Sequence, residues 1–537
     1  MNPLLYGRGT TEGIIAVEPI RDQENKVHVF RRVNGELQAS YETFEPYIYI
    51  NEDDPILERL HNQEEIEQLL GTNFYNVRVR SSNYNTIKWV KKNTKEHYMP
   101  FIQGQWLIHT GNTLFKGMGF DDPLRLYCDI EVLTKEGYEF PNSSRDEDKI
   151  TIIVMRTNQG EEWTLALNDD NQTNKIDDRV IRCKDEKTLL EKWVTLVRKI
   201  DPDIMVWHNG FGFDMPYIRD RAALLDVALQ IGRDGSEPYA FMTSIKFAEK
   251  SDDYENFKIY GRHMIDTYFL AKAYDVVARK LNGYGLKQCV IHLGKASKDR
   301  TYIEGSDLAD AWRNEHPEFN RDDVLRYAFD DVRETQILDQ EWGGNLFAQT
   351  RMCPLPFQDV SRYGTGNKID MLFVREYYFA DWSLPRPEKR RDFGGGYAGI
   401  AEYGFINQRL AYFDVGSMYP TLGQMLNIQP KNDELRLYQP LITALKEARY
   451  EEKNAALEDL RTKLNIERDK AVNNCMQTTM NEMQKVLKDA TKEKENTLLR
   501  VRNEWKDKVA EQMLKFENEK KETRKEHRKK IEVLSTK

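Results

Sequence analysis

The sequence predicts a multidomain α/β protein that continues into a long helical tail. Three patterns predict this: strand-like alternation near the amino end, alternating strands and helices from Leu124 onward, and a tail with no Gly after Gly423 and no Pro after Pro440. The chain has 537 residues, 40% hydrophobic and 31% charged, enough for about three to four domains. This composition excludes a disordered chain and a small disulfide-stapled scaffold.

The first predicted domain is strand-rich and covers residues 1–122. Short apolar strands are expected at 13–17, 27–30 and 47–50, before a break at Asp53-Asp54-Pro55. No run approaches the ~18 apolar residues of a membrane span, and the first residues lack a signal-peptide pattern, so we expect a cytoplasmic protein without a membrane partner. The five scattered cysteines are expected to be buried thiols rather than disulfides or zinc ligands.

The second predicted domain, residues 123–345, has α/β character. Strands are expected at 124–132, 149–156, 162–167 and 203–208, and helices at 185–200 and 215–225.

The net charge is -9 for the whole chain but +5 from residue 441 onward, because that part contains 24 Lys and Arg and 19 Asp and Glu. The overall charge therefore does not decide for or against a nucleic-acid partner.

The tail, residues 436–537, has the composition of long helices. Apolar residues recur in steps of three and four from Met476 to Ala490 and again from Leu498 to Phe516, which predicts a helical hairpin or a coiled coil. The polar run at 473–479 contains poor helix formers and is a candidate turn.

Asp129 and Glu131 are the most informative residues of the sequence. They end an apolar strand, and residues two apart in a strand share a face, so both carboxylates could bind one hard divalent cation. Two exposed acids on an edge strand are the commoner alternative.

Two further segments carry acids at informative places. Asp214 follows the apolar strand at 204–207 and precedes a helix, where it is either a ligand or a helix N-cap. Tyr327 and Asp331 are four residues apart on a predicted helix and share one face, whereas the competing Asp330 points about a quarter-turn away.

Together the three segments resemble the three motifs of the proofreading exonuclease of family B DNA polymerases, a member of the DEDD superfamily with Tyr in the third motif. They read Asp-x-Glu, Asn-x3-Phe-Asp and Tyr-x3-Asp. Segments at 44–47, 265–268 and 357–362 extend the resemblance over residues 1 to about 435. It implies an RNase H-like (DnaQ-like) exonuclease domain at 123–345, a return segment at 346–392, a partial palm at 393–435 and a fingers-like tail.

The resemblance also implies roles for single residues. Two Mg²⁺ or Mn²⁺ ions would be held by four carboxylates, those of Asp129, Glu131, Asp214 and Asp331. Tyr327 would orient the nucleophilic water, while Asn209 and Phe213 would position a frayed single-stranded 3′ end.

Half of a polymerase site is implied as well. The segment at 411–420 resembles motif A, with Met418 in place of the usual Leu; by resemblance its metal ligand is Asp414, and its nucleotide-binding residues are Ser417 and Tyr419. Upstream, a template-contacting turn would use Phe393, Gly395 and Gly396, where Phe replaces the family's Tyr. A plain tight turn is the structural alternative for these glycines.

The second and third polymerase motifs require Tyr and Gly, and the sequence has neither after Tyr450. The leading hypothesis is therefore the amino-terminal subunit of a split, viral or archaeal type of family B polymerase. Its expected partners are primer-template DNA, dNTP, a second subunit with the missing motifs and thumb, and a sliding clamp. The alternatives are a free-standing single-strand exonuclease with a vestigial palm and a nucleic-acid-binding regulator. Under the leading hypothesis the tail is an elongated fingers hairpin on which the second subunit docks; otherwise it is a self-associating coiled coil.

Overall fold

The computed structural model describes residues 2–21, 23–60, 66–168, 180–248, 250–388 and 417–534. Its contacts divide the chain into a core unit, Met1–Leu445, and a tail unit, Lys446–Lys537. Among the described helices, none combines the length and the apolar character that crossing a membrane requires.

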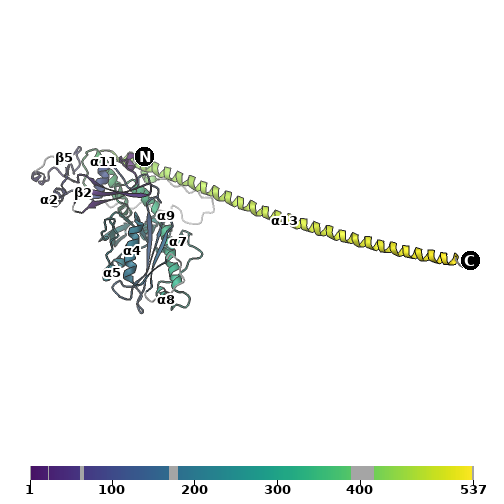
Figure 1. Ribbon diagram of the computed structural model, residues 1–537. Helices are drawn as coiled ribbons and strands as arrows, with labels where there is room; N and C mark the ends of the chain where they lie inside the picture. The colour runs from purple at the N-terminus through teal and green to yellow at the C-terminus, as the bar shows by residue number, and fades with distance from the viewer. Residues whose placement is uncertain are drawn as a thin grey trace, which may run out of the picture. The chain divides into compact units, whose positions relative to one another are not determined.

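Two small antiparallel sheets form the amino-terminal part of the core unit (Figure 1). Their strands, in the spatial orders β1-β2-β3 and β4-β6-β5, are β1 (Ile14–Ile20), β2 (Gln23–Val33), β3 (Glu36–Thr43), β4 (Tyr47–Ile50), β5 (Ile66–Gln68) and β6 (Val77–Arg80). The accompanying helices are α1 (Pro3–Tyr6), η1 (Leu57–Arg59), α2 (Tyr84–Asn93) and α3 (Ile102–Thr110). The strands expected at 13–17, 27–30 and 47–50 are therefore present.

A six-stranded mixed sheet follows, in the order β10-β9-β8-β7-β11-β14. Its strands are β7 (Arg125–Val132), β8 (Ile150–Thr157), β9 (Glu162–Leu167), β10 (Val180–Cys183), β11 (Ile204–Trp207) and β14 (His263–Asp266). β8 is antiparallel to both of its neighbours, whereas β7, β11 and β14 run parallel. The strands predicted between 124 and 208 are all found here.

Helices lie on both sides of this sheet (Figure 1). They are α4 (Glu186–Ile200), α5 (Asp214–Leu224), α6 (Thr267–Ala278), α7 (Leu286–His292), α8 (Leu308–Arg313) and α9 (Arg321–Thr350). α4 forms because Asp185 caps its amino end by accepting a hydrogen bond from Thr188 N–H at 2.7 Å. It packs against β8, β9 and β10, whereas α9 packs across β7, β8 and β11. A separate hairpin, β12 (Tyr239–Phe247) and β13 (Lys250–Lys258), was not expected from the sequence.

A buried ion pair joins α9 to β7. Arg125 Nη1 and the Tyr127 hydroxyl each donate to Asp339 Oδ2 at 3.1 Å, and the Arg125 and Asp339 side chains have no exposed surface. One face of β7 carries every second residue of the strand, namely Arg125, Tyr127, Asp129 and Glu131. The pair therefore fixes α9 along the same strand face that carries the two acids.

After α9 the chain returns to the amino-terminal sheets through α10 (Phe357–Arg362) and α11 (Thr365–Phe379). Single β-bridges join Leu70 to Trp382 and Tyr75 to Leu384. A short helix, α12 (Met418–Met425), lies beyond the segment 389–416, which is outside the described residues.

The tail corrects two expectations. α13 (Tyr438–Leu534) is one helix of 97 residues that continues through 473–479, so no turn and no hairpin form there. Asn and Thr lower helix propensity only slightly, and without Gly or Pro nothing ends the helix. Cys475 is exposed on α13, whereas the other four cysteines are buried as expected.

Candidate active site

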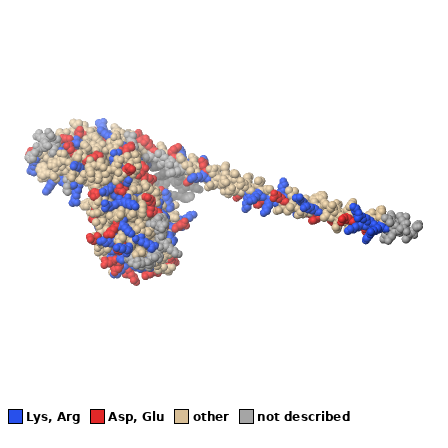
Figure 2. All heavy atoms as spheres, viewed as in Figure 1, with Lys and Arg blue, Asp and Glu red and all other residues tan. Residues whose placement is uncertain are grey.

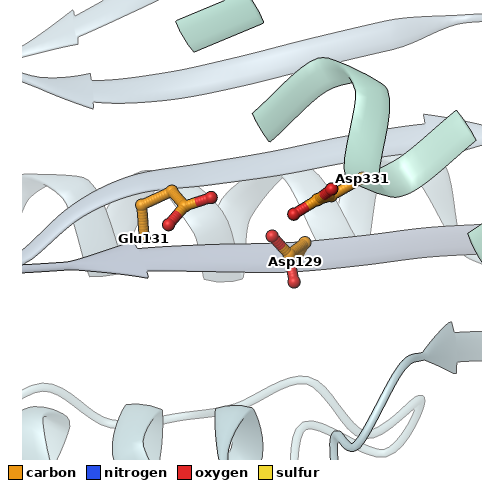
Figure 3. Close-up of side chains that lie close together, drawn as sticks. All are labelled: Asp129, Glu131 and Asp331. Carbon is orange, nitrogen blue, oxygen red and sulfur yellow. The ribbon is translucent and has the colours of Figure 1, made fainter. Parts of the chain in front are cut away.

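Three carboxylates meet where β7 faces α9. Asp129 and Glu131 extend from β7, and Asp331 extends from α9 toward them (Figure 3). One oxygen of each lies within 4.8 Å of the other two. This is the group of acids that could hold a metal ion among the residues that the structure describes. Asp330 points elsewhere, toward Arg300 at 3.5 Å and Arg333 at 3.8 Å, as the helical spacing predicted.

Asp214 lies beside this cluster rather than within it. It begins α5, is buried, and its carboxylate accepts a hydrogen bond from the Ile130 backbone N–H, between the two acids of β7. Its charge is the largest neighbouring contribution that raises the pKa of Asp129. The four predicted ligands therefore share one site, although only three of them form the tight group.

Burial and mutual repulsion make the four acids hard to ionise without cations. Burial, and then the charges of the neighbouring acids, hold the pKa values of Asp129 and Glu131 well above their usual range. Burial raises the pKa of Asp214 to about 8, with Asp266 adding to the shift. Burial also raises the pKa of Asp331, against the effect of Arg300 and Lys287. The site therefore favours bound positive charge.

Two cationic side chains of this site were missed by the sequence reasoning. Lys287 on α7 donates to the Tyr327 hydroxyl, and its ammonium lies 3.9 Å from the centre of that ring. The Arg300 side chain has no exposed surface; it pairs with Asp331, and its Nε lies 3.0 Å from Glu334 Oε1. In sequence both belong to ordinary charged stretches. Their only signal is that four buried acids need cations nearby.

Tyr327 lies one helical turn before Asp331 on α9 and is buried. Burial and the neighbouring carboxylates raise the pKa of its phenol above the usual range. Because Lys287 donates to the phenol oxygen, the hydroxyl hydrogen remains available as a donor to another group.

The loop between β11 and α5 presents Asn209 and Phe213. Asn209 is exposed with a left-handed φ of 65°, and Phe213 is half-buried against Tyr217, with ring centres 5.3 Å apart. Asp266 holds this loop by accepting from the backbone N–H groups of Asn209 at 2.8 Å and Phe211 at 3.2 Å. Asp266 therefore organises the loop and caps α6.

The half polymerase site is described only in part. Ser417, with a φ of 54°, precedes α12, and Tyr419 is 78% exposed. Phe393, Gly395, Gly396 and Asp414 lie outside the described residues. The structure therefore brings together the four predicted carboxylates and Tyr327. It gives no geometry for the predicted nucleotide site.

The donor set fits a hard divalent cation. All four groups are carboxylates, the ligands that Mg²⁺ and Mn²⁺ prefer, and no Cys or His lies among them. Their crowding in a buried site is costly unless cations offset the negative charge. Asp129, Glu131, Asp331 and Asp214 are thus the residues that would hold such ions.

Comparisons with known proteins identify the domain that carries Asp129, Glu131 and Asp214. Residues 68–289 match the family model of the DNA polymerase family B exonuclease domain. The DNA polymerase of Thermococcus gorgonarius is 26% identical over 445 residues, which are 76% of this chain and 53% of that protein. The DNA polymerase of Archaeoglobus fulgidus is 28% identical over 315 residues, 58% of this chain and 35% of that protein.

A solved structure shares the fold. The family B DNA polymerase of Pyrobaculum calidifontis matches with a TM-score of 0.54 and 20% sequence identity, over 71% of this chain and 52% of that one. The chain spans about half the length of the polymerases that it matches. It is a homologue of archaeal family B DNA polymerases and contains the exonuclease domain of that family.

Proposed function

We propose that the chain is a metal-dependent 3′-5′ exonuclease that acts on single-stranded DNA ends. The observation that carries this proposal is the group of Asp129, Glu131 and Asp331, with Asp214 beside it and Tyr327 one turn away. Two bound divalent cations would supply an activated water and stabilisation of the leaving 3′ oxygen.

The residues around the cluster take the remaining roles. Tyr327 stays protonated and donates its hydroxyl hydrogen to orient the attacking water, while Lys287 holds the phenol by donating to its oxygen. The exposed Asn209 and the ring of Phe213 belong to the loop that leads into α5, which begins at Asp214. There they position the 3′-terminal nucleotide of the strand. Asp266 keeps their loop in place.

A 5′-labelled single-stranded oligonucleotide tests this function. With magnesium, the chain is expected to shorten it stepwise from the 3′ end, and the Asp129→Asn, Glu131→Gln double variant is expected to leave it intact. Equal shortening by the double variant would reject the assignment. A 3′-labelled strand should release labelled mononucleotide at once, which separates this polarity from 5′-end degradation.

We also propose that the chain forms one half of a family B polymerase whose second and third motifs reside on a second polypeptide. The homology extends beyond the exonuclease domain, and the helix α13, which follows the motif A-like segment, contains no Gly and, after Tyr450, no Tyr, so this helix carries neither motif. The chain alone is expected not to extend a primed template when dNTPs are supplied. Extension by the chain alone would contradict this second proposal without affecting the first.

A further inference from the structure

The tail helix carries an apolar seam with an eleven-residue period. One row of large side chains repeats every eleven residues: Met476, Leu487, Leu498 and Val509. A second row has the same period: Met483, Lys494, Trp505 and Phe516. Eleven residues span three helical turns, so each row runs nearly along the helix axis, and the two rows lie side by side.

The seam is exposed along its length. Its apolar members are 49% to 72% exposed, with Leu487 at 72% and Trp505 at 66%. Figure 2 shows uncharged stretches alternating with charged clusters along the helix, and Lys and Arg gathering toward its carboxyl end. An exposed apolar stripe of this length along a charge-rich helix is a surface for another helix.

We propose that residues 476–516 of α13 pair antiparallel with the same segment of a second copy of this chain. Each member of one row has a counterpart in the other row at the same distance from residue 496. When a second copy runs in the opposite direction, these counterparts meet, and a large residue lies beside a smaller one. Met476 meets Phe516 of the second copy, and Leu487 meets its Trp505. Such large-with-small contacts fill a helix interface, and Met packs well against aromatic rings.

The position of Lys494 decides the direction of pairing. Lys494 is the one charged member of the two rows. A parallel, in-register pair would place two Lys494 ammonium groups side by side in the seam, where their repulsion is costly. In the antiparallel pair Lys494 lies beside Leu498, so its aliphatic stem packs there while its ammonium reaches water.

The charged end of the tail favours the same direction. Residues 520–530 contain seven Lys and Arg and two Glu. A parallel pair would bring this basic segment against itself. The antiparallel pair brings it beside residues 462–472, which contain three Lys and Arg and two acids. Repulsion is therefore smaller in the antiparallel arrangement.

Seam and non-seam variants of the full chain test the interface. Leu487→Asp places a charge in the seam, whereas Leu514→Asp places one on the far side of the same helix, where Leu514 is 63% exposed. By light scattering after gel filtration at tens of micromolar, the wild type and Leu514→Asp are expected at twice the monomer mass and Leu487→Asp at the monomer mass. Circular dichroism checks that both variants keep their helix content. A monomeric wild type, or equal dissociation of both variants, would overturn the proposal.

The native Cys475 tests the direction. It is exposed, and the other four cysteines are buried. In the antiparallel pair, Cys475 lies level with position 517 of the second copy. The two Cys475 thiols are therefore 42 residues, or about 63 Å, apart along the helix axis. A short bis-maleimide is therefore expected to link no wild-type dimers but to link Cys475 to position 519 of the second copy in a Glu519→Cys variant. Efficient linkage through Cys475 alone would establish parallel pairing and reject the proposal.

Discussion

The ion pair between Arg125 and Asp339 predicts a large loss of stability when one partner is removed. Both side chains are fully buried, and Arg125 also donates to the Phe120 carbonyl from Nε and Nη2, each at 3.2 Å. Asp339→Asn keeps the shape of the site but leaves the Arg125 charge without a counter-ion. Breaking one partner of a buried pair costs about 3–5 kcal/mol.

Glu341→Gln provides a matched control on the same helix. Glu341 pairs with Lys295, and both side chains are more than a third exposed. A solvent-exposed pair contributes about 0–1 kcal/mol. Asp339→Asn is therefore expected to lower the unfolding midpoint of the core unit several times more than Glu341→Gln.

Thermal unfolding of the full-length variants, followed by circular dichroism, measures this difference. At about 2–4 °C per kcal/mol for a domain of 150–250 residues, the Asp339→Asn shift is expected to be about 6–20 °C. Replacing both partners, in Arg125→Met with Asp339→Leu, should recover much of the loss because no buried charge remains uncompensated. Equal midpoints for Asp339→Asn and Glu341→Gln would refute the conclusion that this pair fixes α9 on β7. The single variant should also slow the proposed shortening of DNA, since Asp331 lies about 12 Å from Asp339 on the same helix.

Two further predictions concern single groups. Burial raises the pKa of Glu18 from 4.5 to about 7. Between these two pH values the Glu18 carboxyl stays protonated in the folded chain but ionises in the unfolded chain. Its contribution to stability is therefore lost as pH rises from about 4.5 through 7. Glu18→Gln should stabilise the chain at pH 8 more than at pH 5 in urea unfolding, and an equal effect at both would contradict the assignment. Lys287→Met should slow DNA shortening by about 10- to 100-fold with little change in KM, because Tyr327 loses its positioning contact. The exposed Lys295→Met is the control, and equal rates for the two variants would exclude this role for Lys287.

The elements around the exonuclease motifs could be predicted from the sequence because their patterns are local. Strand β7 and helix α4 follow from apolar periodicity, and the structure places them within about one residue of the expected bounds. Two-residue and four-residue spacings placed Asp129 with Glu131, and Tyr327 with Asp331, on shared faces. The resemblance to family B exonucleases, and not the spacing, assigned Asp331 to the same metal site as the two acids of β7.

The remaining features depend on long-range contacts. Lys287 and Arg300 belong to the site only because α7 and the loop after it fold back against α9. Strand β13 is largely polar, and β12 carries apolar residues in an unbroken run at 239–242 and is mostly exposed or half-exposed, so neither strand shows the alternation that marks a half-buried strand. The expectation of a turn at 473–479 was wrong, because weak helix formers do not end a helix unless a capping residue follows them.

Counting bound Mn²⁺ tests the central claim most directly. Electron paramagnetic resonance of free Mn²⁺ during titration is expected to show two ions bound per wild-type chain. Asp331→Asn is expected to bind at most one, and Asp330→Asn, its neighbour outside the carboxylate cluster, should still bind two. A wild type that binds no Mn²⁺, or equal binding by the two variants, would contradict a metal centre built on Asp129, Glu131, Asp214 and Asp331.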